Sequence, residues 1–144
     1  MAEVTLREIT KDNVTPICKL ELADGQDEFV AHPAVTISQA HYFDERSVLK
    51  AIYADDDLVG LVALAEDEEG WWLWRLAIDK AHQRKGFGSE ALRLIGDLAR
   101  ELGASELFAG YVPKDGNPRD FYLRNGWEET GRIEDEERVI RIAL

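Results

Sequence analysis

Two adjoining segments decide the fold: Trp71-Trp72-Leu73-Trp74-Arg75-Leu76-Ala77-Ile78 and Gln83-Arg84-Lys85-Gly86-Phe87-Gly88-Ser89. The first is too short for a globular helix and is rich in aromatic residues that favour strands. After the second, apolar residues recur at helical spacing, and Gly103 follows as a natural cap of the helix C-terminus. These apolar residues are Ala91, Leu92, Leu94, Ile95, Leu98 and Leu102. The order is therefore a strand, a glycine-containing loop and a helix.

The loop between the strand and the helix predicts an anion site. Gly86 and Gly88 let the backbone turn its N–H groups outward, and the helix start adds unpaired N–H groups and a positive dipole end. Phosphate is the anion expected at such a site. The Walker pattern is absent, and the dinucleotide fingerprint lacks its third glycine because Ala91 stands there. An ordinary strand-to-helix turn is the alternative interpretation.

Length and composition predict a single domain, residues 1–144. Hydrophobic residues make up 45% and charged residues 32% of the chain, values typical of globular proteins. No apolar run approaches the ~20 residues that span a bilayer, and no signal peptide is recognised. Cys18 is the only cysteine and cannot form an internal disulfide. We therefore expect a cytoplasmic protein with no membrane partner.

The net charge of −12 argues against nucleic acid as a partner, because phosphate binding requires a basic face. The acidity is explained either by a solvated, self-repelling surface or by attraction of a polycationic substrate. The charge alone does not separate these two explanations.

The rest of the chain alternates between strand and helix patterns. A helix separates strand 71–78 from strand 106–112, so we expect the two to be parallel and joined by a right-handed crossover. Val35, Ile37 and Ala40 are expected to face inward from a short helix. The expected strands are 3–9, 48–54, 58–65, 127–133 and 138–144, the last two joined by the acidic turn 134–137. The expected helices begin near residues 13–15, at 36 (ending at 43) and at 118 (ending at 124).

Two motifs in this order resemble the GNAT superfamily of N-acetyltransferases. Gln83-x-x-Gly86-x-Gly88 resembles the family's Q/R-x-x-G-x-G/A signature, and Phe121-Tyr122-Leu123-Arg124-Asn125-Gly126-Trp127 resembles its F/L-Y-x-x-x-G-F motif. The resemblance spans the whole chain. It implies an α/β (α+β) GNAT fold, a mixed sheet of about seven strands with about four helices. It also implies acetyl-CoA as cosubstrate and no metal.

A narrower resemblance points to the bacterial spermidine/spermine (diamine) N-acetyltransferase branch, and so to a polyamine substrate. Asp115 and Pro118 stand where many relatives carry Asn and Ala, so Asn117 is the candidate for the pantetheine contact of that Asn. The segments that carry this resemblance are Glu21, Gln26-Asp27-Glu28-Phe29-Val30-Ala31, Ser38-Gln39-Ala40, Trp72-Leu73-Trp74-Arg75-Leu76, Ile78-Asp79 and Tyr122-x-x-x-Gly126.

The family resemblance also implies the roles of the cofactor-site residues. Tyr122 would be the general acid that protonates the leaving thiolate; a core aromatic is the alternative. Backbone N–H groups near Leu76, Ala77 and Ile78 would stabilise the oxyanion, and pantetheine would pair with the same strand. The pyrophosphate would meet the loop residues Gln83, Arg84, Lys85, Gly86, Phe87, Gly88 and Ser89.

The general base and the amine site are less defined by the sequence. No acid occurs from Trp71 to Ile78, which leaves a water relay or an acid from elsewhere. Glu21 and Glu28 are the candidates, and they could equally anchor a distal ammonium. Trp72 and Trp74 fall on one face of the strand, as core packing or as a wall that offers cation–π contact to an amine.

We therefore predict acetyl transfer from acetyl-CoA to a primary amine, with a polyamine preferred, by direct attack in a ternary complex. One alternative keeps the fold and changes the amine to an antibiotic, an amino acid or a protein N-terminus. The other is a non-catalytic acyl-CoA-binding module. The expected partner is a small-molecule amine, and the resemblance leaves a homodimer open.

Overall fold

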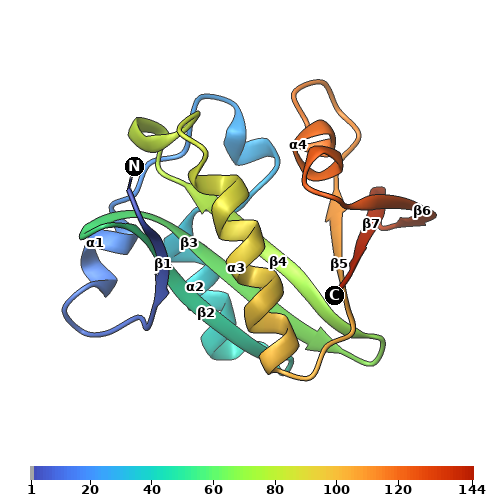
Figure 1. Cartoon of the computed structure of the whole chain (residues 1–144), viewed down its shortest axis with the longest axis horizontal. Coiled ribbons are helices and arrows are strands. Elements are labelled where there is room, and N and C mark those ends of the chain that lie inside the picture. Colours follow the sequence, from blue (N-terminus) through green and yellow to red (C-terminus); the bar gives the residue numbers. More distant parts are fainter. Residues whose placement is uncertain (1) are drawn as a thin grey trace.

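The computed structural model describes residues 2–144 as a seven-stranded sheet covered by helices on both faces (Figure 1). The strand order is β1-β2-β3-β4-β5-β7-β6, with β4 and β5 parallel and every other neighbouring pair antiparallel. The mixed sheet and the four α-helices confirm the expected GNAT fold class. The strands are β1 Val4–Arg7, β2 Arg46–Ala54, β3 Asp57–Asp67, β4 Gly70–Ile78, β5 Glu106–Tyr111, β6 Glu128–Glu134 and β7 Glu137–Ala143. The α-helices are α1 Val14–Cys18, α2 Pro33–Tyr42, α3 Phe87–Glu101 and α4 Arg119–Arg124, with 3₁₀ turns η1 Gln26–Glu28 and η2 Lys80–His82.

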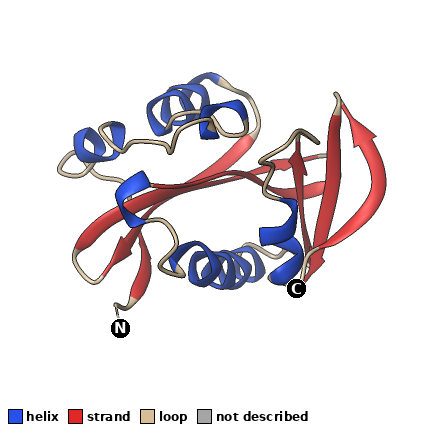
Figure 2. Cartoon of the chain, turned by 90° about the horizontal axis from the view of Figure 1, so that it is seen from above, coloured by secondary structure: helices blue, strands red, loops and turns tan. Residues whose placement is uncertain are grey.

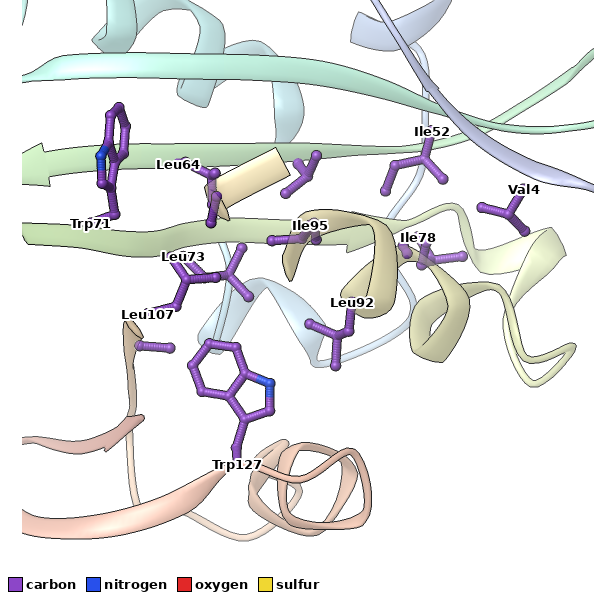
Figure 3. Packing of buried hydrophobic residues seen from close by; sticks show 14 of the residues in the cluster. Val4, Ile52, Leu64, Trp71, Leu73, Ile78, Leu92, Ile95, Leu107 and Trp127 are labelled. Carbon is purple, nitrogen blue, oxygen red and sulfur yellow. The ribbon is translucent and has the colours of Figure 1, made fainter. Parts of the chain in front are cut away.

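The hydrophobic core lies on both faces of the sheet. Helix α3 covers one face and helices α1 and α2 cover the other (Figure 2). The apolar stripe of α3 is buried as its spacing predicts, and Figure 3 shows Leu92 and Ile95 in one cluster with Leu73, Leu107 and Trp127. Burying each such side chain contributes about 2 kcal/mol, so this packing fixes α3 and the loop before it against β4.

Strands β4 and β5 are parallel, as expected, but they pair over two positions only. The pairs are Trp71 with Leu107 and Trp72 with Phe108, after which the strands diverge (Figure 1). Beyond that point β4 stays paired with β3 as far as Ile78, so its edge toward β5 is left open. A register shift also leaves Trp74 without a partner on β3, which is a β-bulge. This divergence creates room inside the sheet.

Two details of the expected elements were wrong. Helix α2 begins at Pro33 rather than residue 36, because proline is favoured in a first helical turn and the His32 side chain accepts a hydrogen bond from the Ala34 N–H. Val35 is consequently 45% exposed. Pro33 and Thr36 are buried instead, and Ile37 packs against the core as expected.

The last hairpin has a tighter turn than predicted. Asp135 and Glu136 both have positive φ, 48° and 69°, as a two-residue turn between twisted strands requires. Glu137, expected in the turn, is therefore the first residue of β7.

Among the described residues 2–144, no helix is long and apolar enough to cross a membrane. The same residues include no group of three His, Cys, Asp or Glu side chains that could hold a metal ion.

Candidate active site

A cavity of about 540 Å³ occupies the opening between β4 and β5. Its walls come from β4, the loop before α3, the first turn of α3 and helix α4. Its charged or ionisable nitrogen groups are Arg75, His82, Arg84 and Arg124, and no carboxylate lines it within the described chain. We call it the basic cavity. In a chain of net charge −12, this concentration of cationic groups marks an anion site.

The loop before α3, which lines one end of the basic cavity, has a series of free backbone N–H donors. Gly86 caps α3 with a φ of 81°, a left-handed conformation that glycine adopts without steric cost. The first hydrogen bond of the helix is donated by Glu90 N–H to the Gly86 carbonyl, at 3.1 Å. Within residues 2–144, the seven consecutive N–H groups from 83 to 89 donate no hydrogen bond. Unpaired N–H groups at the start of a long helix are the donors that phosphate groups bind.

The Gln83 side chain has a structural part in this loop. Its Nε2 donates to the Ile78 carbonyl at 2.9 Å and to Oε1 of Gln26 at 3.0 Å. The amide thus ties the loop to the end of β4 and to η1. It holds the backbone donors in place and leaves their N–H groups free.

Gly88 allows α3 to approach α4 closely. A Cβ at this position would lie 3.2 Å from Cζ of Phe121, tighter than most real contacts. The start of α3 therefore lies directly against the helix that carries Tyr122.

Tyr122 lines the basic cavity from α4. Its ring contacts Phe121 and Trp127 edge-on, with centroids 5.3 Å away in both cases. Burial raises the pKa of the Tyr122 phenol to about 12. No hydrogen-bond partner for the hydroxyl is found among residues 2–144, so a protonated donor is held at the cavity at neutral pH.

A second cavity, of about 610 Å³, adjoins the first and has the opposite charge. We call it the acidic cavity. Arg75 is the only basic residue of its described lining, and Trp72, Trp74 and Phe43 supply aromatic wall. Seven carboxylates line it: Asp27, Glu28, Glu45, Glu66, Asp67, Glu134 and Glu137.

The two cavities share a strip of lining at the point where β4 and β5 diverge. Arg75 belongs to this strip: its Nη1 donates to Oγ1 of Thr36 at 3.0 Å and to Oε1 of Gln39 at 2.9 Å, which links β4 to α2. Its guanidinium also lies 4.4 Å from the Trp74 ring centroid, and burial lowers its pKa from the usual value. The shared residues are Phe29, Val30, Leu73, Trp74, Arg75 and Gly110. Ligands in the two cavities would therefore meet here.

Most residues predicted for the site lie in one of the two linings. The acidic cavity includes Glu28, Trp72 and Trp74. The basic cavity includes Leu76, Ile78, Gln83, Arg84, Gly86, Phe87, Gly88, Ser89 and Tyr122.

Four predicted residues lie outside both linings. The Asn117 amide is engaged locally, since Nδ2 donates to the Lys114 carbonyl at 2.7 Å and Oδ1 accepts from the Arg119 N–H at 2.9 Å. Glu21 forms an exposed ion pair with Lys80 at 2.9 Å. Lys85 is exposed at the loop surface, and the Ala77 side chain is buried in the core.

Sequence reasoning missed Arg75, Thr36, Gly110 and Glu137. A lone charged residue inside the apolar run 71–78 was a signal for Arg75. The other three carry no local signal, because only the sheet pairing brings them to the site.

The sheet order, the diverging parallel strands and the donor loop together define the acyl-CoA N-acyltransferase class of fold. The model of the acetyltransferase (GNAT) family matches residues 14–127, most of the chain. The chain belongs to the GNAT family of acetyltransferases.

Solved structures with the same fold come from several organisms. The GNAT domain of S. lividans PAT is 18% identical, with a TM-score of 0.79 over 99% of this chain and 90% of that one. A GNAT family acetyltransferase from Elizabethkingia anophelis with acetyl-CoA bound is 18% identical, with a TM-score of 0.72 over 98% of both chains. The PaiA N-acetyltransferase of Thermoplasma acidophilum in complex with coenzyme A is 12% identical, with a TM-score of 0.71 over 99% of both. No curated protein matches the chain.

Proposed function

We propose that this protein transfers the acetyl group of acetyl-CoA to a positively charged primary amine, preferably a polyamine such as spermidine. The observation that carries the proposal is the separation of charge between two cavities that share one strip of lining. Among residues 2–144, one is lined by arginines and free backbone donors without a carboxylate, and the other by seven carboxylates and one arginine. An anionic donor and a cationic acceptor fit these two cavities respectively.

The basic cavity has the features that coenzyme A requires. The phosphates of coenzyme A would accept hydrogen bonds from the free N–H groups of residues 83–89, and Arg84 would add positive charge beside them. The pantetheine arm would pair with the open edge of β4 near Leu76 and Ile78. Relatives of this fold bind coenzyme A or acetyl-CoA, which supports this assignment. Acetyl-CoA supplies the activated acyl thioester.

The acidic cavity has the features that a polycation requires. Several separated carboxylates can meet several ammonium groups, whereas a monoamine would use one. Glu28 is exposed at this cavity, and the half-buried Trp72 and Trp74 rings line its wall. The Trp74 ring already stacks on the Arg75 guanidinium, which leaves Trp72 as the ring for a cation–π contact with the ligand.

The chemistry would be direct attack of the amine nitrogen on the thioester carbonyl. The C–N bond forms, the C–S bond breaks, and Tyr122 donates a proton to the departing thiolate. The backbone of the open β4 edge near Leu76 would face the developing oxyanion. Cys18 lies on α1 and lines neither cavity, which supports a reaction without an acetylated cysteine.

A thiol-release assay with a panel of acceptors tests the proposal. Spermidine and spermine should give higher kcat/KM than butylamine, an aminoglycoside or a free amino acid. Glu28→Gln should raise KM for spermidine and spare KM for acetyl-CoA. Glu101→Gln, an exposed acid of α3 outside both cavities, is the matched control. Rising salt should weaken spermidine turnover by screening.

Each competing interpretation has its own outcome in this assay. If butylamine is as good as spermidine and Glu28→Gln behaves like wild type, the polyamine assignment is wrong and acetyl transfer remains. If coenzyme A binds but no amine releases thiol, the chain is a non-catalytic module.

A further inference from the structure

The Glu137 carboxylate lies at the boundary between the two cavities. Glu137 begins β7, and it lines the acidic cavity beside Gly110 of β5, which lines both cavities. An added Cβ on Gly110 would lie 3.4 Å from both Cδ and Oε1 of Glu137. The missing side chain at Gly110 thus gives the carboxylate room at the shared strip, where the two ligands would meet.

Glu137 differs from the other six carboxylates of the acidic cavity. It is half-buried, and among residues 2–144 its carboxylate has neither an ion pair nor a hydrogen bond. The others are exposed, paired or used in a turn. Asp27, Glu28 and Glu45 are exposed, Glu66 pairs with Arg46 at 3.7 Å, Glu134 pairs with Arg132 at 2.7 Å, and Asp67 accepts from the N–H groups of Glu69 and Gly70.

The surroundings of Glu137 favour its protonated form. Burial raises the pKa of its carboxyl, and the nearby Asp135 carboxylate raises it further, while Arg75 on β4 acts in the opposite direction. On β5, Gly110 lies directly against the carboxylate and carries no charge, and Glu106, farther along the same face, is paired with Arg141 at 2.9 Å. Glu134, across the hairpin, is engaged by Arg132. A carboxylate whose pKa is shifted toward neutral pH is a more effective general base.

We propose that Glu137 is the general base of the acetyl transfer, which rests on the function proposed above. Its carboxylate accepts a proton from the acceptor ammonium and releases it to solvent. The neutral nitrogen then attacks the thioester carbonyl. As the C–S bond breaks, Tyr122 protonates the thiolate, and the second proton, lost from the nitrogen, restores the phenol. One amide, one thiol and one free proton result.

Glu137→Gln keeps the shape of the side chain and removes the base. We expect kcat/KM for spermidine to fall by ~10²-fold or more, while the affinity for coenzyme A in calorimetry is unchanged. Glu136→Gln removes the same charge from an exposed neighbour in the adjoining turn and should behave like wild type.

A series of primary amines of decreasing pKa separates a base from a binding or structural residue. An amine that is already neutral at the assay pH needs no base. The ratio of wild-type to Glu137→Gln activity should therefore shrink toward one as the amine pKa falls below the assay pH. A residue that only binds charge or supports the fold would give a deficit that does not follow amine pKa in this way.

The wild-type protein offers a readout without turnover. Carboxyl-detected NMR should show Glu137 titrating above the usual glutamate pKa of ~4.3, and its signal should move when spermidine is added. The assignment is overturned by an ordinary pKa, by full activity of Glu137→Gln, or by a deficit equal for all amines. Absence of turnover in the wild type with every amine would instead defeat the proposed function, and this inference with it.

Discussion

Tyr122→Phe separates the chemistry of the phenol from the packing of its ring. The ring contacts with Phe121 and Trp127, at 5.3 Å between centroids, are kept. The hydroxyl has no hydrogen-bond partner among residues 2–144, so the free energy of unfolding at pH 8 should change by no more than about 0.5 kcal/mol. Loss of the proposed general acid should lower kcat by ~10²-fold, about 2.7 kcal/mol in activation free energy.

The burial of the phenol also makes a prediction for alkaline pH. Its pKa is about 12 in the folded protein, against a reference value of ~10 for an unfolded chain. The folded state thus holds this proton more tightly. Below about pH 10 the phenol is protonated in both states and costs the folded protein nothing. As the pH rises from 10 toward 12 the unfolded chain loses this proton first, so the free energy of unfolding falls. At pH 11 the wild type should have lost about 1.4 kcal/mol through this group, and Tyr122→Phe should lose none of it.

Urea unfolding of both proteins at pH 8 and pH 11 measures this difference, because the shared titrating groups cancel between them. Tyr42→Phe is the matched control, since the Tyr42 side chain is 80% exposed and should show neither effect. Equal kcat in wild type and Tyr122→Phe at saturating substrates would make Tyr122 a packing residue. Equal stability losses at pH 11 would contradict the burial of its hydroxyl.

Three further substitutions test the loop and the packing around the site. Gly86→Asp should abolish coenzyme A binding in calorimetry, because it places a carboxylate beside the free N–H groups. The neutral Gly86→Asn tolerates the same positive φ and should still bind. Equal affinities of the two variants would contradict the anion site. Thr36→Val removes one of two acceptors from Arg75 and should lower the free energy of unfolding by about 1–3 kcal/mol in urea; an unchanged value would show that the bond adds nothing. Gly60→Ala would place a Cβ 2.3 Å from the Ala77 carbonyl oxygen, so its Tm should fall with a cost of about 1–3 kcal/mol, and wild-type stability would refute that close approach.

Much of the fold was predictable because the deciding patterns are local. The strand 71–78, the apolar stripe of α3 and the glycine that ends this helix, Gly103, are contained in short segments, and the structure has each of them. The parallel crossover followed from the helix between two strands. The start of α2 was predicted wrongly although Pro33 and the His32 cap are local signals. The burial of Thr36 was hidden, because its hydroxyl accepts from an arginine 39 residues away, which no local pattern reveals.

Site residues that belong to a sequence motif could be predicted, whereas those brought together only by strand pairing could not. The free donors of residues 83–89 follow from glycine spacing and a helix start. The early end of the β4–β5 pairing does not, because no local pattern in either strand marks where the pairing stops. Glu137 lies 27 residues beyond Gly110 and reaches it only through the β5–β7 register, in which Gly110 pairs with Val139. Asn117 and Glu21 were predicted site residues, but Asn117 is engaged by its neighbours Lys114 and Arg119, and Glu21 pairs with the distant Lys80.

The short pairing of β4 with β5 also determines where amide protons should exchange fastest within the sheet. N–H groups on the open edge of β4 past Trp72 have no ladder partner on β5, whereas those directed at β3 are protected as far as Ile78. A ligand that binds only the folded chain and spans this opening would slow exchange on both strands together. At 100 times its dissociation constant it would add about 2.7 kcal/mol to the free energy of unfolding. The resistance of this protein to unfolding and proteolysis should therefore rise and fall with the supply of its own substrate.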